Sequence, residues 1–424
     1  MSVPDASMKH AAPLEAFLQS FAGTTWDMAE VFSQLREDAP VVYVPILDMW
    51  VVSRYEDVVV ALRDVERFVQ PVGVMGEVPA EFAADLPGGY ALSHTALTNA
   101  NPPDHTRIRK LAQKPLTPRA VLRYEDMIRG VANDLVDRFA DAGRADLVQQ
   151  YAFPLSVTVM ANVLGIPSDR HEDFRRWVLG TFELMVPTLT PQRRAELARD
   201  QVEFSAFVRD TIAERRAAPG DDLISGLVQA REGGEPGLSE SECLGVVAQL
   251  ITGGFETTQG TIGLALNTLC EDRALLDRVL DDPGLLPSLV DETVRRFCPA
   301  RGVFRDTTCD VTLHGQVIPQ GARLFVLIGA ANQDPAQFDC PFAFDVDRDP
   351  GVMRRHVGFG QGIHKCIGIA LAQLDIRIAL EVLLSRLPGL RLVDGEDRPL
   401  AMGFVFSTPQ RLVCAWDHHT TAGA

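Results

Sequence analysis

The chain has 424 residues, of which 46% are hydrophobic and 23% are charged, a balance typical of a globular enzyme. This composition excludes a disordered or collagen-like protein, and the net charge of −17 argues against a general nucleic-acid binder, which needs a surplus of lysine and arginine. The length would allow two or three domains, but no shift in composition divides the chain, so we expect one domain over residues 1–424 with a polar leader over about the first 20 residues.

The seven cysteines are an odd number, are widely scattered and show no CxxC or zinc-like spacing. This pattern predicts reduced thiols in a cytoplasmic protein. The first 19 residues contain several charges and lack the apolar core of a signal peptide. No run of about 18 apolar residues occurs, so we expect no membrane span.

Two runs of β-branched and aromatic residues near the N-terminus predict a β-hairpin. They are Val41–Val44 and Trp50–Val52, and they flank the short connection Ile46–Asp48. Helical spacing of apolar residues follows over Val58–Val65. The segment Val72–Thr98 is rich in glycine, proline and small residues and has no period, and we interpret it as a loop that controls substrate access.

A pair of prolines at positions 102 and 103 predicts the start of a helix that places His105 and Arg109 four residues apart on one face. From composition alone, a solvated basic helix is the preferred interpretation of this face. The next segment, Pro118–Asp221, has a mostly helical pattern broken by glycines and prolines. Within it, the apolar connection Phe182–Leu189 fits either core packing or a lid over a pocket.

The longest predicted helix begins at Ser239 and Glu242, which have the spacing of a capping box, and its apolar run predicts deep burial. The pair Gly253–Gly254 interrupts it, although each mid-helix glycine costs ~1 kcal/mol relative to alanine. Next to them, Glu256–Thr257 places a carboxylate beside a hydroxyl, which is costly in an apolar helix unless the groups are paired or functional. These residues fit either a close helix crossing or a local widening that admits a ligand.

Glu292 and Arg295 are three residues apart on another predicted helix, and their apolar neighbours suggest a buried ion pair rather than a solvated one. Beyond them, Val311–Leu327 is predicted as β structure with turns at its proline and glycines. Near the C-terminus, Leu390–Val393 and Arg411–Trp416 are predicted as strands of a small sheet.

The most informative stretch is Phe359–Gly368, with the sequence FGQGIHKCIG. Its two spaced glycines allow positive φ angles and a close approach to a flat group. Cys366 precedes an apolar helical run, where the helix dipole and amide donors favour the thiolate form that binds metals. A lone cysteine is more often an inert core residue, but a thiolate is also one of the few axial ligands that proteins offer to haem iron.

Together these stretches resemble the cytochrome P450 family. The cysteine loop matches the family's haem-binding pattern, Phe-Gly-x-Gly-x-His-x-Cys-x-Gly, at every fixed position, and Gly253–Thr257 matches the pattern Ala/Gly-Gly-x-Glu/Asp-Thr. The stretch 101–109 is similar to Asp-Pro-Pro-x-His-Thr-Arg-x-Arg, with Asn101 replacing aspartate, and 331–335 is similar to Ala-Asn-Arg-Asp-Pro, with Gln333 replacing arginine. The resemblance implies the family's fold, mainly α with a small β lobe, with haem between the long central helix and the cysteine loop.

The resemblance also implies roles for individual residues. Cys366 would be the axial thiolate of a haem b iron. Thr257 would hydrogen-bond the bound dioxygen or an ordered water, and Glu256 would connect that site to solvent protons. The remaining residues implied to hold the cofactor, through its propionates or by shaping its pocket, are His105, Arg109, Arg305, His356, Phe359, Gly360, Gly368 and Gly253.

The implied activity is monooxygenation, in which one oxygen atom of O2 enters a small apolar molecule by hydroxylation, epoxidation or O-dealkylation. No nucleotide-binding or iron–sulfur motif of a fused reductase is present, so electrons would come from NAD(P)H through a separate ferredoxin reductase and ferredoxin. Arg354, Arg355 and Lys365 border the cysteine loop and would dock that acidic partner. We expect a monomer of the soluble bacterial type, acting in natural-product tailoring or aromatic catabolism.

Two other classes of haem protein are compared with this hypothesis. A peroxide-driven enzyme would not need the Glu256–Thr257 pair, and a haem-based sensor would need an output or DNA-binding segment that the sequence lacks. For the substrate, the sequence indicates only an apolar small molecule, either aliphatic or aromatic. Six side chains fall in segments that border the family's pocket, and core packing explains each of them equally well: Phe182, Met185, Phe255, Phe304, Phe404 and Phe406.

Overall fold

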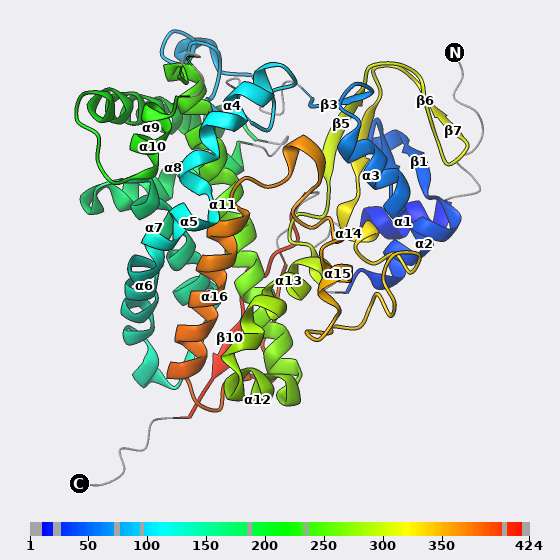
Figure 1. Cartoon of the computed structure of the whole chain (residues 1–424), viewed down its shortest axis with the longest axis vertical. Coiled ribbons are helices and arrows are strands. Elements are labelled where there is room, and N and C mark those ends of the chain that lie inside the picture. The colour runs from blue at the N-terminus through cyan, green and yellow to red at the C-terminus, as the bar shows by residue number, and fades with distance from the viewer. Residues whose placement is uncertain are drawn as a thin grey trace.

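The computed structural model describes residues 11–19, 27–71, 77–93, 97–184, 189–231, 234, 237–400 and 405–417. Most helices form one side of the molecule, and a sheet with the N-terminal helices forms the other (Figure 1). The long helix α11 (Glu240–Glu271) runs through the helical side next to α16 (Ile369–Arg386). The prediction of a mainly α fold with a small β lobe is confirmed.

Helix α11 lies at the centre of the helical side because its sequence is apolar around nearly its whole circumference. Its N-terminus has the predicted capping box, in which the Glu242 amide donates to Ser239 Oγ at 3.1 Å and the Ser239 amide donates to a Glu242 carboxylate oxygen at 2.8 Å. The helix packs against α7 (Phe153–Leu164), α13 (Leu286–Phe297) and α16. One wall of any cavity in this part of the fold is therefore formed by α11.

The other α-helices surround this centre or cover the sheet. The predicted helix after the proline pair is confirmed as α4 (Asp104–Ala112). The mostly helical character of residues 118–221 is also confirmed. The remaining α-helices are α1 (Ala11–Gln19), α2 (Ala29–Asp38), α3 (Tyr55–Arg63), α5 (Pro118–Val121), α6 (Glu125–Asp137), α8 (His171–Glu183), α9 (Pro191–Ala217), α10 (Leu223–Gln229), α12 (Arg273–Asp281), α14 (Ile328–Ala331) and α15 (Pro350–Met353).

The largest sheet has the strand order β1-β2-β8-β5-β3. The predicted hairpin is confirmed, since β1 (Val41–Val44) and β2 (Met49–Val52) are antiparallel with Val41 opposite Val52. The other strands are β3 (Phe68–Val69), β5 (Val303–Thr307) and β8 (Arg323–Val326), and β8 pairs in parallel with β2. Alternation of side chains along these strands gives two apolar faces, one packed with residues of α2 and the other with residues of α3.

Two smaller sheets complete the β structure. The predicted C-terminal sheet is confirmed as β9 (Arg391–Leu392) and β10 (Val413–Ala415). It has a third strand, β4 (Arg144–Asp146), which the sequence did not predict because three residues within a helical pattern carry no period. Separately, β6 (Val311–Leu313) and β7 (Gln316–Ile318) form a two-stranded hairpin with its turn at His314 and Gly315.

The predicted burial of the Glu292–Arg295 pair is confirmed. The Arg295 guanidinium donates to both carboxylate oxygens of Glu292 at 2.7 Å, and the side chains are 0% and 1% exposed. Arg295 also donates to the carbonyls of Asn332 and Pro341, at 2.9 and 2.8 Å. Such a pair is stable in the interior only when all of its donors and acceptors have partners, and here those partners belong to the segment that leads to the cysteine loop.

Among the described residues, no helix combines the length and apolarity that crossing a membrane requires. Several predictions fall on residues outside the described ranges: 72–76 and 94–96 of the proposed access loop, 185–188 of the proposed lid, and Phe404. The rest of the access loop includes the 3-10 turns Ala80–Phe82 and Ala91–Ser93.

Candidate active site

A cavity of about 300 Å³ lies between α11 and the Phe359–Gly368 loop. Helix α11 contributes Gly253 and Thr257 to its wall, and the loop contributes Phe359, Gly360, Cys366 and Gly368. Most of the remaining wall consists of aliphatic side chains, including Leu97, Val159, Met160, Leu250, Val294, Val303 and Leu371. The tertiary fold therefore brings together two motifs that are about 110 residues apart in the chain, on opposite sides of one mostly apolar space.

Cys366 is held at the end of this loop by its backbone, since its amide donates to the Phe359 carbonyl at 2.8 Å. Its thiol is exposed to the cavity and otherwise enclosed by protein. Burial raises the pKa of the Cys366 thiol, whereas the Gly368 amide and the charges of Arg109 and Lys365 lower it. These three groups stabilise the thiolate, as the sequence predicted. Burial, however, disfavours the thiolate by more than they favour it.

The two glycines of the loop differ in their environment. Gly360 has a φ of 69° and lines the cavity, with its nearest neighbouring atoms at 3.7 Å or more from a hypothetical Cβ. Gly362 has a φ of 73°, and a Cβ there would lie 2.6 Å from the Leu62 carbonyl oxygen at the end of α3. Gly360 is therefore the glycine that allows close approach of a ligand, and Gly362 allows the loop to pack against α3.

The two glycines of α11 also have different neighbours, so both interpretations of the Gly253–Gly254 pair apply. A Cβ on Gly254 would overlap the end of the Met160 side chain on α7, against which α11 packs, so Gly254 fits a close helix crossing although it also lines the cavity. A Cβ on Gly253 would have no neighbour within 4 Å and would project into the cavity. Thr257 lies one turn later and donates its hydroxyl proton to the Gly253 carbonyl at 2.7 Å.

Glu256 does not line the cavity, because it points from α11 toward the C-terminal segment. Its carboxylate accepts hydrogen bonds from Gln259 Nε2 at 2.8 Å and from Thr408 Oγ1. Burial raises the pKa of the Glu256 carboxyl group, although these hydrogen bonds oppose the rise. Neither partner was identified from the sequence. Nothing local indicates that Thr408, about 150 positions away, contacts Glu256, whereas the spacing of three residues between Glu256 and Gln259 on one helix was an available signal.

Buried basic side chains cluster near one end of the cavity. His105 is 1% exposed, neither of its ring nitrogens has a hydrogen-bond partner, and its ring centroid lies 4.2 Å from that of His364. Burial and the charge of Arg109 lower the pKa of His105 to about 4, and burial lowers the pKa of Arg305 to about 10. Among the described residues, no carboxylate forms an ion pair with Arg109 or Arg305, so these donors are suited to binding an anionic group.

His356, which the resemblance assigned to a haem propionate, is not on the cavity wall, whereas His364 is. His364 lines the cavity, and its Nδ1 lies 3.1 Å from the Leu97 carbonyl. His356 is absent from the cavity wall, packs against Phe359 with ring centroids 5.7 Å apart, and accepts a hydrogen bond from the Gly358 amide. The His364 position was visible in the FGQGIHKCIG pattern, but only the fold shows that its side chain turns toward His105.

Three of the aromatic residues proposed to border the substrate, Phe255, Phe304 and Phe406, do not line this cavity. Phe255 is 2% exposed and packs against Phe153 with centroids 5.1 Å apart, and Phe304 packs against Phe325 at 5.3 Å. Phe406 contributes a backbone bridge to Ala300. Phe255 and Phe304 are therefore core residues, which was the alternative interpretation of their positions. The wall of the cavity is mainly aliphatic.

Comparisons with known proteins identify the family. The model of the family described as Cytochrome P450 matches residues 27–282 and 280–415. The chain belongs to the cytochrome P450 family. It is 38% identical to Cytochrome P450 107B1 of Saccharopolyspora erythraea, over 83% of this chain and 85% of that protein. It is 37% identical to the Mycinamicin IV hydroxylase/epoxidase of Micromonospora griseorubida, over 87% and 90% of the two chains.

Solved P450 structures share this fold. The structure of CYP109E1 from Bacillus megaterium in complex with corticosterone has a TM-score of 0.81 and 28% identity, covering 92% of this chain and 98% of that one. The structure of P450BioI with an acyl carrier protein has a TM-score of 0.82 and 27% identity, covering 96% and 100%. With its named relatives, these matches establish the protein as a cytochrome P450 monooxygenase.

Haem with a cysteine thiolate ligand is the cofactor of the P450 family, and the residues at this cavity fit it. A thiol faces the cavity at Cys366, and Gly360 and Gly253 leave space on two of its walls. Neutral His105, near Arg109, has one ring N–H without a partner, which is a donor of the kind that a buried carboxylate needs. The donor set and the space at this P450 cavity therefore match an anionic, flat, thiolate-bound group.

The P450 cavity also has polar atoms that the sequence analysis did not identify. Ser156 Oγ on α7 and Asp375 Oδ1 on α16 are buried, have no hydrogen-bond partner, and belong to side chains that line the cavity. Burial raises the pKa of Asp375 to about 7. The sequence did contain a signal for Asp375, which is an aspartate within an apolar helical run. A buried carboxyl group in such a run is costly unless it has a partner or a function.

We expect the stability of Asp375→Asn to differ from wild type in a pH-dependent way. The folded protein holds the Asp375 proton more tightly than the unfolded chain does, so wild type loses stability as the pH rises from about 4 to about 7. The asparagine variant lacks this loss, and its relative stability should grow by about 1 kcal/mol per pH unit in that window and level off above it. Urea unfolding at several pH values measures the difference.

A matched control is Glu381→Gln, on the same helix in a partly exposed ion pair. Comparing the two variants at each pH separates the effect of the buried Asp375 from that of removing any carboxyl group of α16. A difference for Asp375→Asn that is flat with pH would show that this carboxyl group ionises normally.

Proposed function

We propose that this P450 binds haem b through Cys366 and inserts one oxygen atom of O2 into an apolar organic molecule. The observation that supports this most directly is that the Cys366 thiol and the Thr257 hydroxyl line one mostly apolar cavity from different elements. When bound, haem supplies the activation of O2 and the transfer of an oxygen atom. The protein supplies an axial thiolate, proton donors and a dry, shaped space.

The residues proposed to hold the haem lie on the cavity wall or directly behind it. Cys366 Sγ would bind the iron, and Arg109 and His364 on the wall, together with His105 and Arg305 behind it, would neutralise the propionates. Phe359, Gly360, Gly368 and Gly253 line the cavity and shape its walls. His356 has a supporting role in this proposal, because it accepts a hydrogen bond from the Gly358 amide and packs on Phe359.

Thr257 and Glu256 are proposed to deliver protons. The Thr257 hydroxyl donates its proton to the Gly253 carbonyl. Thr257 Oγ1 is therefore free to accept a hydrogen bond from a water in the cavity. Glu256 lies on the other side of α11, where burial favours its protonated form and Thr408 and Gln259 hold it. This arrangement favours monooxygenation over a peroxide-driven reaction, which needs no external proton supply to the cavity.

The substrate is proposed to be an apolar natural product or a related small molecule. The aliphatic wall formed by Leu97, Leu250 and Val303 favours contact with hydrocarbon surfaces and has few polar groups to orient a charged substrate. Relatives that cover most of this chain carry the names 6-deoxyerythronolide B hydroxylase, which is 34% identical over 91% of this chain, and Mycinamicin IV hydroxylase/epoxidase. These names support hydroxylation or epoxidation in natural-product tailoring over aromatic catabolism.

The test of this function is the spectrum of the dithionite-reduced protein with carbon monoxide. Wild type should show the red-shifted Soret band of thiolate-ligated haem, and Cys366→Ala should lack it because no sulfur remains at that position. Cys309→Ala is the matched control, since Cys309 is also exposed but lies outside the cavity wall, and it should behave as wild type. An unchanged band in Cys366→Ala would contradict the proposed ligand.

The proposed proton delivery predicts that Thr257→Ala uncouples the reaction. Removing the hydroxyl takes away the acceptor that is proposed to order a proton-donating water at this turn, so reductant should be consumed with about tenfold less product and with release of hydrogen peroxide. Thr257→Ser keeps the hydroxyl and should retain most of the coupling. The measurement is product and peroxide formed per NAD(P)H oxidised, and wild-type coupling in Thr257→Ala would exclude this role.

An acidic ferredoxin reduced by an NAD(P)H-dependent reductase is the proposed electron donor. Arg354 and Arg355 are exposed just before the cysteine loop, and Lys365 is exposed within it. Reversing both charges (Arg354→Glu with Arg355→Glu) should slow reduction by ferredoxin about tenfold or more at low salt, and the difference should shrink as salt screens the charges. The control is Arg273→Glu on α12, and equal rates for all three proteins in stopped-flow reduction would contradict this docking surface.

A further inference from the structure

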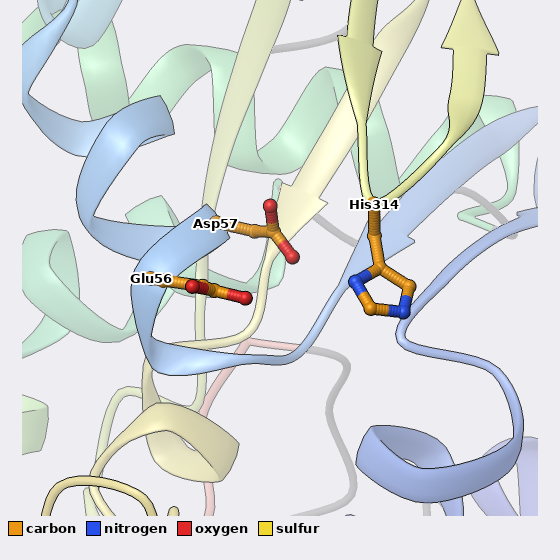
Figure 2. A group of neighbouring side chains, drawn as sticks. All are labelled: Glu56, Asp57 and His314. Atoms are coloured by element: carbon orange, nitrogen blue, oxygen red, sulfur yellow. The ribbon is translucent and has the colours of Figure 1, made fainter.

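A second cluster of potential ligands lies at the sheet side of the molecule, away from the haem cavity. Glu56 and Asp57 are in the first turn of α3, and His314 is at the turn of the β6–β7 hairpin (Figure 2). Each side chain offers one ligand atom, and these three atoms lie within 4.8 Å of one another. In Figure 2 the imidazole lies beside the two carboxylates, so two segments about 255 residues apart meet here.

Asp57 is the unusual member of this cluster. It is 7% exposed, and its Oδ2 has no hydrogen-bond partner. Burial, followed by the negative charge of Glu56, raises the pKa of the Asp57 carboxyl group. A buried carboxylate oxygen without a partner is costly, and a bound cation is one of the few ways to satisfy it.

Among the described residues, Arg54 is the lysine or arginine that contacts the cluster, and it contacts His314 rather than the two carboxylates. Its Nη1 lies 3.3 Å from His314 Nδ1, and its Nε donates to the Arg36 carbonyl at 3.0 Å. Arg54 makes no ion pair with Asp57 or Glu56 among the described residues, although its charge lowers the pKa of Asp57. It therefore compensates the two carboxylates only in part and competes with any cation that would bind there.

We propose that Glu56, Asp57 and His314 bind a divalent transition-metal ion, of which Zn2+ suits the donor set best. Two carboxylate oxygens and one imidazole nitrogen are ligands that Zn2+ accepts at about 2.0–2.2 Å, and water completes the four-coordinate shell. Such bonds bring ligand atoms to within about 3.5 Å of one another. Glu56 and His314 are exposed, so rotation of their side chains closes the remaining distance around the fixed Asp57.

The proposed ion would add a polar link between two parts of the fold that already share a buried apolar cluster. The β6–β7 hairpin has only two strands and packs on α3 through Val311, Leu313 and Ile318. The ion would attach its turn to the start of α3. The end of α3 packs against Gly362 of the cysteine loop, so the site would stiffen a helix that supports the active site.

The experiment is isothermal titration of the chelator-treated holoprotein with Zn2+, and separately with Mg2+, together with the thermal midpoint at each metal concentration. Wild type should bind one Zn2+ at this site, bind Mg2+ far more weakly, and show a higher midpoint with Zn2+ because the ion binds the folded state. Asp57→Asn and His314→Gln should each weaken Zn2+ binding about tenfold or more. Arg54→Gln should tighten it, since a competing cation is removed.

The matched control is Glu66→Gln, which removes an exposed carboxylate beyond the other end of α3 and should bind Zn2+ as wild type does. His314→Gln is at an exposed turn, so a wild-type haem spectrum and circular dichroism will show that it is folded. Equal affinities in wild type, Asp57→Asn and His314→Gln would place the bound Zn2+ elsewhere and overturn the proposal. Absence of Zn2+ binding to folded wild type and to Arg54→Gln would overturn it as well.

Discussion

The buried ion pair between Glu292 and Arg295 is the interaction on which the geometry of the active site depends. Arg295 binds both oxygens of Glu292 and the carbonyls of Asn332 and Pro341, and Glu292 also accepts from the Asp345 amide at 3.0 Å. Asn332 in turn accepts from the Val357 amide at 2.6 Å, directly before the cysteine loop. The long irregular segment that leads to Cys366 is therefore fixed by charged hydrogen bonds in the core rather than by regular secondary structure.

The cavity has an apolar interior, and polar groups lie at separate positions on its wall or behind it, each suited to a different task. Basic side chains with lowered pKa values, including His105 and Arg305, gather where a buried anion would lie. Carboxyl groups with raised pKa values, Glu256 and Asp375, lie on α11 and α16, where they can hold protons. The separation is possible because the basic groups belong to α4, β5 and the cysteine loop, whereas the carboxyl groups belong to α11 and α16.

Long patterns with a strong physical basis were predictable from the sequence. The capping box at Ser239, the β1–β2 hairpin and the buried pair at Glu292 are local signals that tertiary packing did not override. Other features were not predictable. The third strand of the C-terminal sheet, Arg144–Asp146, is too short to show a period, and the contact between Thr408 and Glu256 joins distant segments. Predictions for Phe255 and Phe304 depended on side-chain direction, which spacing alone leaves open.

By itself, the sequence determined the family, the order of its motifs and the residue types available for chemistry, because the spacing of FGQGIHKCIG and of Gly253–Thr257 is a local property of the chain. Only the tertiary structure decided which of those side chains share a space. It turned His364 rather than His356 to the cavity, aimed Glu256 away from it, and brought His314 beside Asp57. The reason is physical: side-chain direction is set by how helices and strands pack against one another, and that packing depends on residues far apart in the chain.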